Sequence, residues 1–444
     1  MATALAIGTG RRTRYRWVVL GLMFVLYTFA FADRANIGIA LPHIKKEFGL
    51  SNAEAGLIAS LFSLTYAFCQ VPASLIVRRL GVRRVVPLFM ALTSLAAASA
   101  GFASSVFMLK ASRLTLGVVE APLAISMSTT LNNWFSPREK GIAAGVFSAS
   151  TKFGPVIVPP LGALVIATLG WREVFFVFAI PGLLLGAAWL FLVSDRPGAS
   201  KFVSPAEAEH IEGIVLDRAV DGIAAPRAFP RLDRLIRARY VRPLATTGEV
   251  FRSWTVWGAS ICYLLVQGIV GVILFLLPLY LTEVKHLSIM NVGFVAASPF
   301  AGAVFGNLLG GWISDHVFAS RRKPMMIVTF ASTVVTMWLL RGAPNNVAAL
   351  AVLLFGTGVL LTIGYSVYTV YQAPMTTKSA FPVALSIMNT MGQIGTALVP
   401  LVAGAAIDLY GWNAVFAGLS LCSMLGLGVL LTIVEPLADA ASRA

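Results

Sequence analysis

The chain has 444 residues, of which 58% are hydrophobic and only 12% are charged, and its mean hydropathy is +0.83. Soluble domains carry about 25% charged residues, so this composition excludes a water-soluble globular fold and indicates a polytopic protein of the lipid bilayer. The net charge of +15 does not indicate a nucleic-acid partner, because the basic residues lie in short loops between apolar spans, as the positive-inside rule describes.

Twelve apolar stretches are each long enough to cross a bilayer, which takes roughly 20 residues as a helix. They cover 17–41, 53–77, 85–106, 111–134, 141–168 and 172–194 in the first half, and 254–281, 290–314, 324–340, 346–373, 381–408 and 412–434 in the second. We therefore predict an all-α membrane protein with twelve transmembrane helices in two six-helix bundles.

A polar stretch separates the two groups of spans. It divides the chain into a predicted N-terminal six-helix bundle (1–194), a cytoplasmic linker (195–250) and a C-terminal six-helix bundle (251–444). Ser204 and the glutamate three residues later have the spacing of a capping box, which predicts a short surface helix at the start of the linker.

The distribution of basic residues predicts the orientation of the chain. Four arginines precede the first span, four more lie in the loop 78–84 and three basic residues lie at 321–323, whereas the alternate loops carry fewer. Because basic loops stay on the cytoplasmic side, we expect both termini to face the cytoplasm.

The two halves of the chain resemble each other. Several residues match when the sequence is compared with itself at a shift of 237 or 241 residues. The matched pairs are Gly56–Gly293, Gly154–Gly395, Pro159–Pro400 and the Gly-Trp dipeptides at 170–171 and 411–412. Chance matches of Gly and Pro are the alternative explanation, and the paired dipeptides make it weaker. A parallel duplication relates the halves by an axis along the membrane normal and predicts a substrate site between them near the midplane.

Four ionisable residues lie deep in the N-terminal spans. Asp33 and Arg34 are neighbours in the first span, and Arg113 and Glu120 lie seven residues apart in the fourth. On a helix that spacing places the last two on one face, about 10 Å apart along the axis. Ionised side chains at this depth are costly and usually mark a substrate or ion path. The alternative is a charge pair that merely cancels itself or lies near the membrane surface.

Further polar residues are candidates for the substrate site. Lys152 lies near the middle of the fifth span, where a lysine cannot reach either membrane surface. It either contacts the substrate as a second cation, which favours a doubly acidic molecule, or forms an internal ion pair with one of the two carboxylates. Tyr66, Asn389 and Gln393 also lie in apolar spans; amides that face lipid are costly, whereas helix packing is the alternative role for a tyrosine.

The loop after the eighth span reads GGWISDHVFASRRK (Gly310 to Lys323) and resembles the loop signature of the major facilitator superfamily. The resemblance covers nearly the whole chain and implies the fold of that superfamily, with Asp315 as the acidic residue of a conformational loop. The corresponding stretch ASLIVRRLGVRR (Ala73 to Arg84) departs from the signature, because Arg78 stands where the acid is expected. Since that acid helps to latch the cytoplasmic side in the family, a latch in the first half is in doubt.

Within that superfamily the chain resembles the anion:cation symporter family, which includes sugar-acid, hexuronate, phthalate, tartrate, vesicular glutamate and sialic-acid transporters. The matching stretches are ADRANIGIALPHIKKEFGLS (32–51), TYAFCQVPAS (65–74), SRLTLGVVEAP (112–122) and NNWFSPREKGIAAGVF (132–147). In that family the acidic positions carry protons and the arginines hold the anion. The resemblance implies that Asp33 and Glu120 couple protons and that Arg34 binds the substrate; we expect Arg113 to pair with Glu120.

The chemistry of these residues predicts a coupling mechanism. A guanidinium matches a carboxylate in shape and charge, and an anion that draws an arginine away from a carboxyl group favours protonation of that group. We expect a proton-coupled symporter that imports an organic anion, which is a carboxylate, a sugar acid or a dicarboxylate, by alternating access. A proton-driven drug or metabolite antiporter (efflux) of the same superfamily is the alternative, although it does not need paired arginines.

The sequence gives little support for an enzyme. It has no phosphate-binding loop, no Ser/His/Asp set and no His/Cys cluster with metal-ligand spacing. We therefore expect no enzymatic activity, no metal and no cofactor apart from the coupling proton. The expected partners are a small organic anion and the lipid bilayer, and we expect a monomer in a bacterial-type cytoplasmic (inner) membrane.

Overall fold

The computed structural model describes residues 13–136, 139–212, 229–377 and 380–437. The first six long helices are α1 (Tyr15–Phe48), α2 (Asn52–Leu80), α3 (Val82–Ser99), α4 (Val106–Trp134), α5 (Lys140–Thr168) and α6 (Trp171–Leu192). The linker contains η1 (Pro197–Ala199), α7 (Pro205–Glu212), α8 (Pro230–Leu235), β1 (Ala238–Tyr240) and α9 (Thr247–Arg252). The remaining elements are α10 (Trp254–Glu283), α11 (Ile289–His316), α12 (Lys323–Leu340), α13 (Val347–Thr362), α14 (Tyr365–Tyr371), η2 (Ala373–Met375), α15 (Phe381–Tyr410), α16 (Trp412–Thr432) and β2 (Glu435–Leu437).

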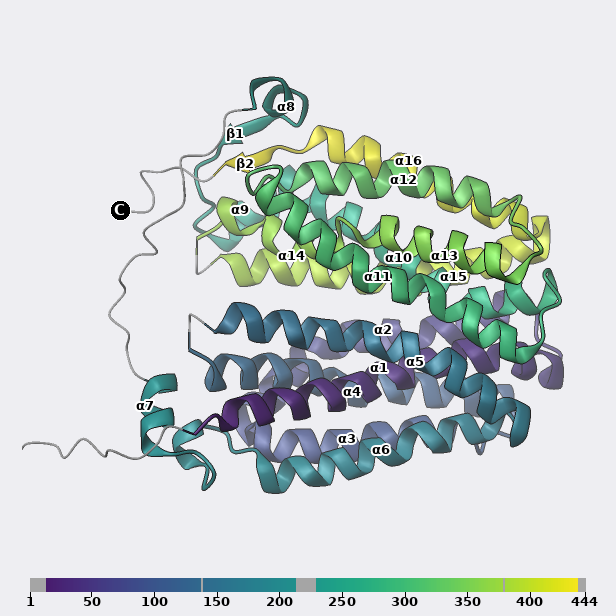
Figure 1. The fold of residues 1–444 in the computed structure, drawn as a ribbon, viewed down its shortest axis with the longest axis horizontal. Coiled ribbons are helices and arrows are strands. Elements are labelled where there is room, and N and C mark those ends of the chain that lie inside the picture. The colour runs from purple at the N-terminus through teal and green to yellow at the C-terminus, as the bar shows by residue number, and fades with distance from the viewer. Residues whose placement is uncertain (1–12, 137–138, 213–228, 378–379, 438–444) are drawn as a thin grey trace, which may run out of the picture.

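Two groups of helices lie side by side, α1–α6 in one bundle and α10–α16 in the other (Figure 1). Within the described residues twelve spans are long and apolar enough to cross a membrane, with α13, α14 and η2 counted as one, which confirms the predicted all-α membrane fold. In the first bundle α1 packs against α5, α2 against α4 and α3 against α6. In the second bundle α10 packs against α15, α11 against α13 and α12 against α16, so the packing repeats in the same order.

The contacts between the two bundles repeat as well, since α2 packs against α15 and α11 packs against α5. A Cβ on Gly56 would lie 2.5 Å from the carbonyl oxygen of Pro400, and a Cβ on Gly293 would lie 2.7 Å from the carbonyl oxygen of Pro159. Both positions therefore need glycine, which lets two backbones touch. The residues that match in sequence thus form equivalent contacts in space, as a duplication requires.

The end of the bundles that carries α7, α8 and β1 is called here the linker end, and the opposite end is called the far end (Figure 1). Lys45 Nζ lies 2.5 Å from Glu283 Oε1, and Asp408 accepts hydrogen bonds from Asn52 and from the backbone N–H of Ala53. Every hydrogen bond or ion pair found between described residues of the two bundles lies at the far end. The polar contacts that join the described residues of the two bundles are therefore confined to the far end.

The tenth span, predicted as the continuous stretch 346–373, is interrupted at Ile363 and Gly364 between α13 and α14. The N–H of Gly364 donates a hydrogen bond of 2.7 Å to Thr329 Oγ1 on α12, and a Cβ at this glycine would lie 2.5 Å from the carbonyl oxygen of Met325. A side chain of a neighbouring helix thus replaces the missing partner inside the helix, which makes the break tolerable within a membrane. The break places Tyr365 at the start of α14.

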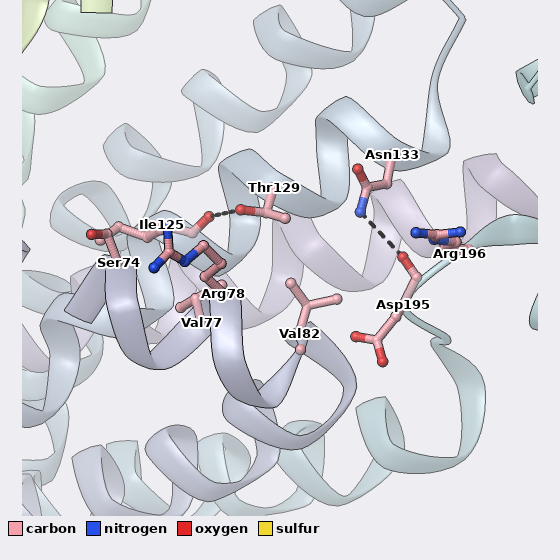
Figure 2. Close-up of a pocket in the computed structure, with 10 residues that line it drawn as sticks. Ser74, Val77, Arg78, Val82, Ile125, Thr129, Asn133, Asp195 and Arg196 are labelled. Atoms are coloured by element: carbon pink, nitrogen blue, oxygen red, sulfur yellow. Dashed lines mark hydrogen bonds between the residues drawn. The ribbon is translucent and has the colours of Figure 1, made fainter. Parts of the chain in front are cut away.

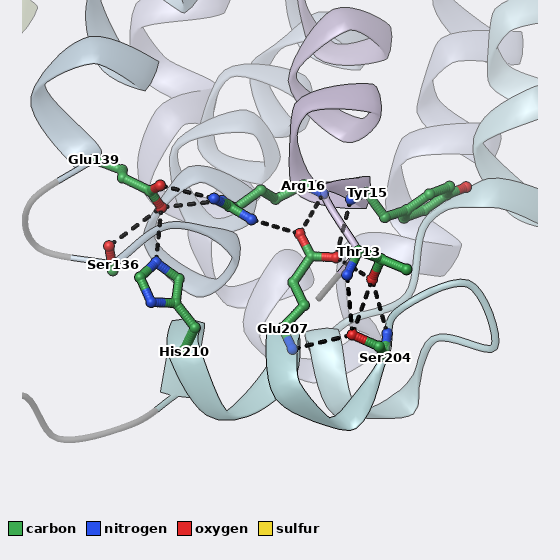
Figure 3. A network of polar contacts seen from close by, with 8 residues as sticks. All are labelled: Thr13, Tyr15, Arg16, Ser136, Glu139, Ser204, Glu207 and His210. Carbon is green, nitrogen blue, oxygen red and sulfur yellow. Dashed lines mark hydrogen bonds and ion pairs between the residues drawn. The ribbon is translucent and has the colours of Figure 1, made fainter. Parts of the chain in front are cut away.

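The linker helix α7 docks onto the beginning of α1 (Figure 3). The helix begins after Ser204, whose Oγ accepts a hydrogen bond from the Glu207 N–H as predicted. The carboxylate of Glu207 does not close the capping box; it accepts hydrogen bonds from the Thr13 hydroxyl, the Tyr15 N–H and the Arg16 guanidinium. Because the first N–H groups of a helix lack partners within it, Glu207 caps α1 from a distant segment.

The rest of the linker contacts the second bundle. Strand β1 pairs in parallel with β2, with Ala238 opposite Glu435. The carboxylate of Glu435 accepts hydrogen bonds from the backbone N–H groups of Arg322 (2.7 Å) and Lys323 (2.9 Å) at the start of α12. Each bundle is therefore capped at the linker end by a glutamate from another part of the chain.

Glu207→Gln is expected to lower the free energy of unfolding by about 1–3 kcal/mol, since the buried hydrogen-bond network loses its negative charge and one of its two acceptor oxygens. Burial alone raises the pKa of Glu207, but hydrogen bonds from Thr13, Arg16 and the Tyr15 backbone outweigh it and lower the pKa below its usual value of 4.5. An acid whose pKa is depressed on folding stabilises the protein above its unfolded pKa and loses that contribution as the pH falls. The difference between wild type and variant should therefore be constant near neutral pH and shrink below about pH 4.5.

Thermal unfolding of the purified protein in detergent, measured between neutral and acidic pH, checks this. Glu209→Gln is the matched control, because Glu209 is exposed on the same helix. If Glu207→Gln and Glu209→Gln melt alike at neutral pH, the capping role of Glu207 is wrong.

Candidate functional site

Four ionisable residues of the first and fourth spans form one buried group, called here the charge cluster and made of Asp33, Arg34, Arg113 and Glu120. Arg34 Nε lies 2.6 Å from Glu120 Oε1, with side-chain exposures of 9% and 0%, so an ion pair joins α1 to α4. The prediction that Arg113 pairs with Glu120 is wrong. Arg113 lies two helical turns away on the same helix as Glu120, whereas α1 brings Arg34 directly against the carboxylate.

Arg113 lies beside Asp33 instead. Its Nη1 donates a hydrogen bond of 3.4 Å to the backbone carbonyl of Asp33, and its guanidinium lies 5.5 Å from the ring centroid of Phe175. The Asp33 carboxylate accepts a hydrogen bond of 3.5 Å from the Asn36 amide. Neighbouring residues of a helix point about 100° apart, which is why Asp33 and Arg34 contact different partners.

Aromatic rings surround the guanidinium of Arg34. Its carbon lies 4.2 Å from the ring centroid of Phe31, 4.8 Å from that of Phe62 and 4.4 Å from that of Tyr66. A Cβ on Gly117 would lie 2.3 Å from the Phe62 carbonyl oxygen, so this glycine lets α2 approach α4 and bring Phe62 and Tyr66 over the arginine. Each such cation–π contact contributes about 0.5–2 kcal/mol, and together they hold the guanidinium in place without neutralising it.

Several atoms of the charge cluster have no hydrogen-bond partner among the described residues. They are Asp33 Oδ2, Arg34 Nη2, Glu120 Oε2 and, on Arg113, Nε and Nη2. Buried polar atoms are nearly always paired, so such atoms need a functional explanation. In the Arg34–Glu120 pair a guanidinium nitrogen has a free N–H group and a carboxylate oxygen has free acceptor capacity. The guanidinium can therefore donate a further hydrogen bond to an anion, and the carboxylate can accept a proton.

Lys152 lies between the two bundles. Its Nζ lies 4.2 Å from the ring centroid of Tyr365 on α14, and the Tyr365 hydroxyl accepts a hydrogen bond of 3.0 Å from the Tyr263 hydroxyl on α10. No ion pair joins Lys152 to a carboxylate within the described part of the chain, which argues against the internal ion pair considered above. The residue faces the second bundle, as the predicted site between the halves requires.

Asn389 and Gln393 lie one turn apart on α15, where Asn389 is exposed and Gln393 is partly buried. A Cβ on Gly392 would lie 2.5 Å from the ring of Tyr263, so this part of α15 lies against α10. Both amides belong to the second bundle, whereas the charge cluster is formed by α1 and α4 of the first.

The sequence analysis did not select Asn36 or Tyr263. Asn36 is fully buried three residues after Asp33, and a polar residue at that spacing on an apolar helix shares its face. Tyr263 and Gln267 have a similar spacing in the seventh span, which is otherwise apolar. Polar pairs at i, i+3 or i, i+4 within predicted spans were the signal that could have found both.

Asp315 and Arg78 lie at the linker end, away from the charge cluster. Asp315 pairs with Arg322 at 2.6 Å. Arg78 and Asp195 both line a cavity of about 310 Å³, and Figure 2 shows Asp195 beside Asn133, apart from Arg78. Asp195 Oδ1 accepts a hydrogen bond of 3.0 Å from the backbone N–H of Arg83 at the start of α3. In the first bundle the acidic residue beside the turn between α2 and α3 is therefore Asp195, from the segment after α6, whereas position 78 near the end of α2 carries an arginine.

The duplicated six-helix packing and the buried charge cluster are typical of a transporter. The family model of the Major Facilitator Superfamily matches residues 23–319 and 259–444 of this chain. The chain belongs to the Major Facilitator Superfamily, and it is a transporter and not an enzyme.

Relatives that are similar along the chain point the same way. A D-galactonate transporter of Escherichia coli O6:H1 is 27% identical over 95% of this chain and 96% of its own length. A probable galactarate/D-glucarate transporter of Bacillus subtilis is 25% identical over 94% of this chain and 93% of its own. A probable sulfoacetate transporter of Cupriavidus necator is 28% identical, and the match covers 69% of this chain and 67% of that transporter.

Among solved structures, a bacterial homologue of the human lysosomal transporter Spinster, in an inward-facing and occupied conformation, is similar with a TM-score of 0.71. It is 17% identical and the match covers 95% of this chain and 96% of that chain. This likeness concerns the fold alone.

Proposed function

We propose that this transporter imports an organic anion of the sugar-acid class together with protons across the cytoplasmic membrane of a bacterium. The observation that carries the proposal is the buried Arg34–Glu120 ion pair inside an aromatic cage. The similar transporters named for galactonate, galactarate and glucarate support the same substrate class.

The pair couples the anion to the proton through competition for one arginine. A substrate carboxylate that binds Arg34 weakens the contact of the guanidinium with Glu120. A buried carboxylate without its cation is costly, so Glu120 takes up a proton when the anion arrives. Asp33 serves as the second proton carrier, beside Arg113 and Asn36. The proton is the coupling ion, and one chain contributes both bundles, so a monomer suffices.

The arrangement of the bundles fits an inward-facing state. The excess of basic residues in the loops at the linker end supports a cytoplasmic location for that end and for both termini. The far end, where Lys45, Glu283 and Asp408 fasten the bundles, is then the extracellular side. Alternating access would release these contacts and bring the linker ends together.

Uptake by membrane vesicles or proteoliposomes tests the proposal. An acidic exterior is expected to drive accumulation of radiolabelled D-galactonate or galactarate, and a protonophore should abolish it. Loss of preloaded substrate under the same gradient would instead show the antiporter. Transport that is independent of the pH gradient would contradict proton coupling.

A further inference from the structure

Lys152 and Arg34 lie at neighbouring depths on helices that run in parallel. A Cβ on Gly154 would lie 2.8 Å from the Thr28 carbonyl oxygen of α1, and a Cβ on Gly162 would lie 2.9 Å from Ile39 of the same helix. This register sets Lys152 level with about Phe29, so it lies five residues, or roughly 7–8 Å, along the axis from Arg34. The two positions therefore differ in depth by about the length of a short diacid.

The present partner of Lys152 is weak compared with an anion. The ammonium group contacts the Tyr365 ring, and a cation–π contact contributes less than a charge-assisted hydrogen bond to an anion. Lys152 and Tyr365 are both only partly buried, whereas Arg34 is already paired with Glu120. An anionic group that reaches this point can therefore draw the lysine away from the ring at little cost.

The site holds one more cation than the two carboxylates can pair. The charge cluster and Lys152 together hold three cations and two carboxylates, which leaves one excess positive charge when both acids are ionised. If a dianion enters together with two protons, the same single excess charge remains. A path through a membrane penalises changes in buried charge, and a monoanion with one proton keeps the same balance. The feature that suits a second acid group is therefore Lys152 itself, a cation that contacts an aromatic ring and forms no ion pair among the described residues.

We infer that Lys152 binds the second acid group of the substrate and makes this chain selective for organic diacids over monoacids of the same length. The inference rests on the proposed function, since it assigns the first acid group to Arg34. It adds a specificity-determining contact on α5 and predicts which class of organic anion is taken up.

Competition experiments with two acids of one carbon chain test this. D-Galactonate has one carboxyl group and galactarate has two, and their hydroxyl groups are otherwise alike. Half-saturating concentrations for inhibition of uptake, and thermal shifts of the purified protein, are measured for wild type, Lys152→Gln and Lys152→Arg. Lys140→Gln is the matched control, because it removes a lysine from the first position of the same helix.

Wild type is expected to prefer galactarate. Lys152→Gln should weaken galactarate by about tenfold or more, as expected for the loss of one charge-assisted contact, and should change D-galactonate less than about threefold. Lys152→Arg should keep most of the preference, and Lys140→Gln should keep all of it.

Other outcomes overturn the inference. Equal affinity of wild type for both acids, or an equal loss of both acids in Lys152→Gln, would show that Lys152 does not read the second acid group. If Lys152→Gln does not fold, loss of the galactarate preference in a folded Lys152→Met supports the inference, and its retention contradicts it. Failure of wild type to bind or take up either acid would overturn the proposed function itself, which separates the two failures.

Discussion

Glu120→Gln is expected to abolish proton-driven accumulation of the organic anion while leaving exchange of the anion across the membrane largely intact. An inward gradient of about one pH unit supplies ~1.4 kcal/mol per proton, which corresponds to roughly tenfold accumulation for one coupled proton. A glutamine resembles the protonated acid, so Arg34 stays available to the substrate at every pH. The variant should therefore carry the anion in both directions but equilibrate it without concentrating it.

Vesicles loaded with unlabelled substrate measure exchange, and vesicles with an imposed pH gradient measure accumulation. Asp33→Asn should show the same separation of the two activities. Glu47→Gln is the matched control, because Glu47 is an exposed acid on the same helix as Asp33 and pairs with Arg172 at the far end. Unchanged accumulation in both Glu120→Gln and Asp33→Asn would refute the assignment of these acids as proton carriers.

Gly310→Ala is expected to destabilise the protein strongly. A Cβ at this position would lie 1.5 Å from the carbonyl oxygen of Ile363 and 2.6 Å from its carbon. Both are backbone atoms at the break between α13 and α14, so no side-chain rotation can relieve the overlap. Overpacking of a tight interface costs about 1–3 kcal/mol where side chains can move, and a backbone overlap should cost at least as much.

Gly311→Ala is the control in the adjacent position. Its Cβ would lie 3.9 Å from the Ser366 hydroxyl, which is an ordinary contact, and alanine favours a helix by ~1 kcal/mol over glycine. Thermal unfolding in detergent should therefore show Gly310→Ala melting well below wild type and Gly311→Ala at or slightly above it. Equal midpoints for the two variants would mean that α11 and α13 are farther apart than described.

Much of the fold could be predicted from the sequence, because a membrane leaves few choices. A bilayer requires long apolar helices, so the twelve spans follow from hydropathy alone. The matches Gly56–Gly293 and Pro159–Pro400 predicted the duplication, and in the structure these residues form equivalent contacts between the bundles. Such contacts depend on small residues whose identity is visible in the sequence.

The partners within the site could not be predicted in the same way. The depth of a residue follows from counting positions along its span, and equal depth suggested that Asp33, Arg34 and Glu120 lie close together; in the structure all three are buried and Arg34 contacts Glu120. Which arginine meets Glu120 depends on the rotation of α1 against α4, which places Arg34 against this carboxylate. A count along a single helix favoured Arg113, and this was the wrong choice.

The interruption near Gly364 and the remote cap by Glu207 escaped prediction for a related reason. Both depend on partners from other segments, Thr329 in the first case and the start of α1 in the second. Local patterns describe a segment by itself, so they extended the tenth span through its break and closed a capping box within the linker. In the structure, hydrogen bonds between residues far apart in the sequence stabilise the break at Gly364 and engage the Glu207 carboxylate.

The way in which the two bundles touch has a mechanical consequence. At Gly56 the backbone lies against the carbonyl oxygen of Pro400, and at Gly293 it lies against the Ala163 methyl group and the carbonyl oxygen of Pro159. The two glycines themselves bring no side chain to these contacts. The two contacts are equivalent by the internal duplication, and each lies near the beginning of its helix, α2 or α11, so they are the pivots about which one bundle can tilt against the other. A tilt about these contacts requires no change of side-chain rotamer at the glycines. The energy barrier to tilting then comes mainly from breaking the polar contacts of Asp408 and Lys45.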